Sequence, residues 1–122
     1  MGCCIVCGKE RDNKSVTCEK CIKKNYAKSI LGSTKKAHVI EELFNSQNRR
    51  CAYTGLRLEL GVNASLDHII PRSQGGSNDP SNLQWVHKWV NYMKSTTPSD
   101  EFLEQLNRFV YALLLNESDM IA

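Results

Sequence analysis

With 122 residues, of which 41% are hydrophobic, the chain can form one compact core and has little sequence left for a second domain of ordinary size. No apolar stretch approaches the roughly 20 residues of a membrane-spanning helix, and no signal peptide opens the sequence. We therefore expect a cytoplasmic protein with no membrane partner. The net charge of +3 divides unevenly, because nine Lys/Arg accompany three acids in residues 1–36, whereas one accompanies five acids in residues 99–122. The basic charge of residues 1–36 favours a polyanionic partner, although a solvated lysine-rich helix explains this charge about as well.

Two C-x2-C pairs lie near the start of the chain. They are Cys4 with Cys7 and, after ten intervening residues, Cys18 with Cys21. Four thiolates at this spacing can close a tetrahedral Zn²⁺ site, which is structural because no position is left for substrate or water. We predict a zinc knuckle over residues 1–25. Two disulfides are the weaker alternative for a reducing compartment, and Cys3 remains a possible substitute for Cys4.

Linking helices are predicted over residues 26–46. The lysine-rich segment from Ile22 to Leu31 ends at Gly32, a residue that commonly stops helices. Ser33 or Thr34 can cap the next helix, whose apolar stripe is formed by Ala37, Ile40, Leu43 and Phe44.

A polar constellation lies between Leu66 and Lys94, after a predicted strand and turn at residues 51–58. Asp67 and His68 lie in an apolar, strand-like run, which a loop rich in Gly, Ser, Asn and Pro separates from a short strand and a helix that carries Asn91. The oxygens of Asp67 and Asn91 suit a divalent cation, and a neutral His68 beside it can take a proton from water. A metal and such a base together suit phosphodiester hydrolysis.

At these residues the sequence resembles the HNH nucleases, the ββα-metal family. The matching residues, within residues 47–97, are Asp67-His68-Ile69-Ile70-Pro71, Gly75-Gly76, Asn82-Leu83, and Asn91 with Lys94. The resemblance implies that His68 is the general base and that Asp67 and Asn91 bind Mg²⁺ or Mn²⁺. It also implies that Asn82 completes the catalytic set by holding the loop and orienting the base. The implied activity is metal-dependent cleavage of double-stranded DNA.

One departure from the family concerns zinc. Many HNH proteins carry one C-x2-C pair before the motif and another on its helix, which together bind zinc. The four corresponding places here hold Cys51, Thr54, His87 and Val90. Two ligand types are lost, so we predict no zinc there and expect Cys51 to be a small buried hydrophobe.

A geometric difficulty concerns Asp67 and His68, because neighbouring side chains of a regular strand point to opposite faces. We expect a twist, a bulge or the end of the strand at this point. Arg72, Lys88 and Lys94 are the predicted phosphate contacts, and Arg72 is the best of them because a guanidinium can bind two oxygens at once. Trp85 and Trp89 could stack on bases, but we expect them in the core.

Residues 98–122 are predicted to form a C-terminal helix and tail. Ser99 can cap this helix, with Asp100 and Glu101 in its first turn. Its wide apolar face is expected to cover the ββα core, and a homodimer seam is the second interpretation.

The sequence thus predicts an α+β protein: a zinc knuckle, linking helices, an HNH core and a C-terminal helix. The predicted function is that of a small HNH endonuclease of the homing or nicking type, with structural Zn²⁺ and catalytic Mg²⁺ or Mn²⁺. A non-catalytic zinc-ribbon DNA-binding protein on an HNH-derived core is the main alternative, and a zinc-stapled interaction adaptor is a third.

Overall fold

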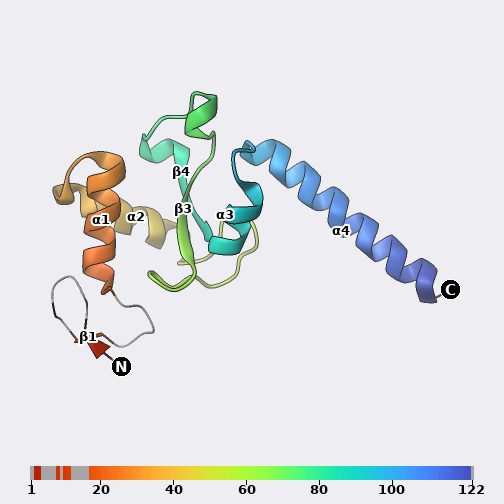
Figure 1. Ribbon diagram of the computed structural model, residues 1–122, viewed down its shortest axis with the longest axis horizontal. Coiled ribbons are helices and arrows are strands. Elements are labelled where there is room, and N and C mark those ends of the chain that lie inside the picture. The colour runs from red at the N-terminus through yellow and green to blue at the C-terminus, as the bar shows by residue number, and fades with distance from the viewer. Residues whose placement is uncertain (1, 4–7, 9, 12–16, 122) are drawn as a thin grey trace.

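The computed structural model describes residues 2–3, 8, 10–11 and 17–121 (Figure 1). Its elements are β1 (Gly2–Cys3), β2 (Glu10–Arg11), α1 (Glu19–Leu31), α2 (Ala37–Ser46), β3 (Ala64–His68), β4 (Leu83–His87), α3 (Lys88–Lys94) and α4 (Ser99–Ile121). The predicted α+β class is confirmed, because helices are followed by a ββα unit and a C-terminal helix. Among the described residues, no helix is long and apolar enough to cross a membrane.

The hairpin of β3 and β4 forms the centre of the molecule. The two strands pair antiparallel in one continuous register, from Ala64 opposite His87 to His68 opposite Leu83. Side chains alternate between the faces of a strand, so the pair Leu66 and Trp85 lies on one face and the pair Asp67 and Gln84 on the other. The first face is covered by α1 and α2, and the second by α3 (Figure 1).

Trp85 is the centre of the apolar core. Its side chain is fully buried, as expected, and the rings of Tyr26 and Phe44 meet it edge-on at centroid distances of 5.1 and 5.2 Å. Gln47 binds the backbone of the same residue twice, because Nε2 donates to Trp85 O and Oε1 accepts from Trp85 N. The expected stop of α1 at Gly32 is also confirmed, with φ at 83°.

The segment between α2 and β3 differs from the prediction. Residues 51–58 form turns rather than a strand, and this region contributes an isolated bridge between Arg50 and Arg57. Cys51 is 3% exposed, which confirms the expectation of a buried small side chain. Its Sγ accepts a hydrogen bond from His87 N at 3.3 Å, so the thiol helps to fix this turn against the end of β4.

The C-terminal helix covers the core only at its beginning. Phe102 is buried and meets Tyr53 edge-on at 5.3 Å, and Leu106 packs against the same cluster. Further along, Phe109 and Leu113 are 62% and 67% exposed, and α4 projects away from the hairpin (Figure 1). The expectation that this helix covers the ββα core is therefore wrong after its second turn, because α3 already occupies that face.

The expectation that Trp89 lies in the core is also wrong. The helix α3 has seven residues and buries Val90 and Lys94, which are four positions apart and face the hairpin. Trp89, one position before Val90, consequently points outward and is 62% exposed.

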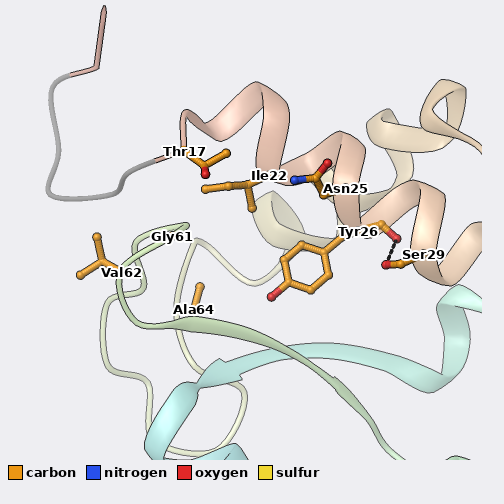
Figure 2. A pocket seen from close by; sticks show the side chains of 8 residues that line it. All are labelled: Thr17, Ile22, Asn25, Tyr26, Ser29, Gly61, Val62 and Ala64. Atoms are coloured by element: carbon orange, nitrogen blue, oxygen red, sulfur yellow. Dashed lines mark hydrogen bonds between the residues drawn. The ribbon is translucent and has the colours of Figure 1, made fainter. Parts of the chain in front are cut away.

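A hollow of about 470 Å³ lies between α1 and the segment that leads into β3 (Figure 2). The ring of Tyr26 points across it toward Ala64, and burial raises the pKa of the Tyr26 hydroxyl above its ordinary value. None of the residues that line this hollow is acidic, basic, His or Cys. Its lining therefore offers no general base and no charged ligand for a metal, and the candidate chemistry lies elsewhere.

Candidate active site

A cleft of about 290 Å³ lies at the end of β3. Its lining includes four residues that the sequence singled out, namely Asp67, His68, Arg72 and Asn91. They come from β3, from the turn after it and from α3, so the ββα unit brings together residues up to 24 positions apart in the sequence. The cleft thereby combines a carboxylate, an imidazole, a carboxamide and a guanidinium.

Asp67 is buried in an ion pair with Lys94. The carboxylate is 4% exposed and Lys94 is 1% exposed. Lys94 Nζ donates to Asp67 Oδ1 at 3.1 Å and to the backbone oxygen of His68 at 2.9 Å. Lys94 is thus not placed as the expected phosphate contact. A carboxylate in this apolar setting requires a cationic or hydrogen-bonding partner, and α3 supplies the cation from its last turn.

The second oxygen of Asp67 belongs to a chain of hydrogen bonds. Gln84 Nε2 donates to Asp67 Oδ2 and to the Tyr53 hydroxyl, each at 2.9 Å. Tyr53 donates to Ser99 Oγ at 2.6 Å, and Ser99 donates to Ile69 O at 3.1 Å. Burial and, as a smaller contribution, the charge of Asp67 raise the pKa of Tyr53, which keeps its hydroxyl a donor. This chain ties the start of α4 to the end of β3.

His68 lies at the last position of β3, where its ring meets the loop that follows. Its Nε2 and Asn78 Oδ1 are 2.8 Å apart. Because the amide oxygen can only accept, Nε2 carries the proton and Nδ1 is left as the basic nitrogen. The register shows no bulge at this point, and the end of the strand is what allows Asp67 and His68 to reach one cleft.

Asn82 closes the loop between the two strands. Its Oδ1 accepts from Ile70 N at 2.9 Å, and its Nδ2 donates to the backbone oxygens of Ile70 and Ser77 at 3.0 and 2.9 Å. Gly76 allows this closure, because a Cβ atom there would lie 1.7 Å from the Ile70 oxygen. The loop that carries Asn78 is thus fastened at both ends to the residues that follow β3.

Asn91 lies across the cleft from the end of β3. Its Nδ2 donates to Ser65 Oγ at 2.7 Å, which directs the amide nitrogen to the strand and leaves the oxygen as the donor atom for a cation. One carboxylate and one carboxamide suit a hard divalent ion such as Mg²⁺, which keeps several waters and needs few protein ligands. Each Asp67 oxygen has a second lone pair beyond its hydrogen bond, so these residues fit such an ion.

Three other residues considered in the sequence analysis are Arg72, Lys88 and His87. Arg72 is exposed at the mouth of the cleft. Lys88 is exposed at the start of α3, with Nζ 5.9 Å from the centre of the Trp89 ring. His87 caps this helix, because its Nδ1 accepts from Trp89 N at 3.2 Å.

The N-terminal cysteines are only partly described. Cys4 and Cys7 lie outside the described residues, whereas Cys18 and Cys21 are buried at the start of α1. In the described part of the chain, no three His, Cys, Asp or Glu side chains come together as a metal site.

Sequence reasoning missed several residues that hold the side chains of this site, among them Asn78 and Gln84. Gln84 lies directly opposite Asp67, but this pairing depends on a register that a 14-residue loop does not reveal. Asn78 lies among several polar loop residues of similar type, and nothing in the sequence distinguishes it from Ser77 or Asp79. No signal in a single sequence would have found either contact.

Comparison with known proteins gives one family. Residues 49–94 match the family model described as HNH endonuclease. No curated protein matches the chain. The matched range begins in the turn before β3 and ends at Lys94, so it contains every residue of the cleft up to the end of α3.

The buried ion pair yields a prediction about stability. Lys94→Met should lower the free energy of unfolding by about 3–5 kcal/mol, because Asp67 would then be a buried charge without its partner. Chemical denaturation followed by circular dichroism measures the loss. Lys88→Met, an exposed control on the same helix, should leave stability nearly unchanged. The double variant Asp67→Asn with Lys94→Met should be more stable than Lys94→Met alone, and the opposite order would contradict this account.

Proposed function

Because residues 49–94 are an HNH endonuclease domain, we propose that the protein cleaves double-stranded DNA in the cleft at the end of β3. The HNH family acts on DNA and generally uses a divalent metal. The observation that supports this site is that Asp67, His68 and Asn91 line one cleft, although they come from a strand and from a helix that packs on it. A plasmid incubated with the protein and Mg²⁺ or Mn²⁺ tests the activity directly.

In this proposal His68 is the general base. With Nε2–H held by Asn78, its Nδ1 takes a proton from water, and the resulting hydroxide attacks phosphorus while the bond to the 3′ oxygen breaks. Mg²⁺ or Mn²⁺ held by Asp67 and Asn91 would supply positive charge against the phosphate oxygens. Arg72 and Lys88 are exposed and can contact the phosphate backbone of the DNA. Asn82 keeps the loop closed, so that Asn78 stays beside the imidazole of His68.

The role of His68 leads to a kinetic prediction. His68→Ala should lower the rate of plasmid cleavage by at least about 10²-fold, because the reaction loses its proton acceptor, while the melting temperature stays close to that of the parent. Gel-based cleavage under single-turnover conditions measures the rate. His38→Ala removes an exposed histidine of α2 and should cut at the parental rate. A His68→Ala protein that cuts normally would overturn the assignment.

Asn78 extends the same test, because we propose it as a positioning residue. Asn78→Ala should lower kcat by about fivefold to tenfold with little change in KM, which is the size expected for one lost hydrogen bond. Asn78→Asp keeps an oxygen that accepts from Nε2–H and should restore kcat. If KM rises instead, or if both variants lose activity equally, Asn78 acts by another route.

We also propose that residues 1–25 hold a structural Zn²⁺ through Cys4, Cys7, Cys18 and Cys21. Two observations on described residues support it. Gly2–Cys3 and Glu10–Arg11, which flank the first cysteine pair in the sequence, pair as a short antiparallel ribbon, and the second pair is buried at the start of α1. Such a site requires reduced thiols, so we propose that the protein acts inside the cell.

Elemental analysis tests the zinc proposal. The purified parent should contain one zinc per chain, and Cys21→Ser should lose it, because three thiolates bind zinc less well than four. Cys51→Ser, which alters a buried cysteine of the HNH domain, should keep the ion. Cys3→Ser and Cys4→Ser would identify the fourth ligand. Zinc retained by Cys21→Ser, or lost by Cys51→Ser, would refute this ligand set.

The outer turns of α4 support a homodimer as a further proposal. Exposed apolar side chains follow one another almost without interruption from residue 109 to residue 115, among them Phe109, Val110 and Leu113. A single chain has one candidate cleft and would nick one strand per encounter, whereas a dimer would bring two clefts to one duplex. A small enzyme of the homing type, which we propose here, could act as a nicking monomer or as a dimer that cuts both strands.

Sedimentation equilibrium tests the dimer. The parent should sediment at twice the chain mass of 13.8 kDa, and Leu113→Asp should shift it to a monomer, because a carboxylate cannot be buried in the seam without a partner. Glu104→Asp, at an exposed position nearer the start of the same helix, is the control. A parent that stays monomeric across the concentration range would exclude this seam.

A further inference from the structure

The outer side of α3 carries an unusually exposed aromatic pair. Trp89 and Tyr92 are 62% and 80% exposed, and Met93 beside them is 60% exposed. The two rings meet nearly at right angles, with centroids 6.4 Å apart. The amino group of Lys88 lies 5.9 Å from the centre of the Trp89 ring. These side chains are not needed for the core, because the opposite side of α3 already provides its buried contacts.

We propose that Trp89 and Tyr92 stack on unpaired bases of the DNA strand that enters the cleft, so that the preferred substrate is a duplex interrupted by a gap, flap or bulge. This inference rests on the function proposed above, and it adds the class of DNA. Aromatic rings bind unstacked bases with little sequence preference, because every base offers a flat face. Within a continuous duplex those faces are covered by neighbouring base pairs.

The pair lies on a helix that also contributes to the cleft, which supports this occupant. The same short helix carries Asn91 on its cleft side, and Ser95 and Thr96, which directly follow it, line the cleft. A helix of seven residues is about 10 Å long, which corresponds to roughly three nucleotides of a DNA strand. A base on Trp89 would therefore belong to a nucleotide close to the phosphate that is cut.

Charge distinguishes this surface from the exposed apolar side of α4. The helix α3 contains no acidic residue, and its exposed charge is the ammonium of Lys88. By contrast, Asp100, Glu101 and Glu104 precede the exposed apolar residues of α4 and would repel a phosphate backbone that ran along this helix. Lys88 lies over one face of the indole, so a base would stack on the opposite face while the ammonium contacts the neighbouring phosphate. The α3 surface thus fits a nucleic acid better than the α4 surface does.

Binding measurements with matched variants test the proposal. Fluorescence anisotropy would compare a fully paired duplex with the same duplex carrying a short single-stranded gap, at fixed salt and without added divalent ion. Trp89→Ala should weaken binding to the gapped DNA about tenfold and change binding to the paired duplex less than twofold, whereas Trp89→Phe should stay close to the parent. Leu56→Ala is the control, because Leu56 is 56% exposed but lies in the turns before β3.

Intrinsic fluorescence provides a second readout. Trp85 is fully buried, so quenching by a single-stranded oligonucleotide should report on Trp89 and disappear in Trp89→Phe. Equal weakening of both DNAs by Trp89→Ala, or no weakening of either, would overturn the inference. A parent that binds gapped DNA as expected but does not cleave with Mg²⁺ or Mn²⁺ would instead refute the proposed function.

Discussion

The ion pair between Asp67 and Lys94 is the contact on which the site depends. It joins β3 to the last turn of α3 where both side chains are almost inaccessible to water. Removing two charges from water is costly, and the cost is offset only when further hydrogen bonds complete the arrangement. Gln84 and the backbone oxygen of His68 provide these bonds. The helix that carries Asn91 is thereby fixed against the strand that carries the candidate base, before any metal or DNA is bound.

The hairpin separates support from chemistry by placing them on opposite faces. Trp85 and its ring partners from α1 and α2 fill one face with apolar side chains. The other face carries Ser65, Asp67 and Gln84, whose polar groups are bonded to α3 or to each other. A two-stranded sheet is marginal by itself, and helices on both faces make it rigid enough to position a site. Substitutions on the apolar face should therefore affect stability first, and substitutions on the polar face should affect the cleft.

The sequence predicted the order of elements and the residues of the cleft better than it predicted their partners. Helical periodicity located α1 and α2, and the Asp67-His68 motif located the strand β3, which runs from Ala64 to His68. Two predictions for α3 were wrong, because Trp89 was expected in the core and Lys94 at the surface. Which side of α3 is buried depends on the ion pair between Lys94 and Asp67 of β3. Periodicity within one element contains no information on such a long-range contact.

The attachment of α4 has a consequence for how the molecule is arranged in space. Its 23 residues span about 35 Å, but its apolar anchors to the core, Phe102 and Leu106, lie in the first two turns. The rest of the helix is a stiff arm, and a partner seated on its outer turns would be held at a set separation from the cleft. Lengthening or shortening the arm by one turn would move that partner by about 5 Å and rotate it little, without altering the chemistry at His68.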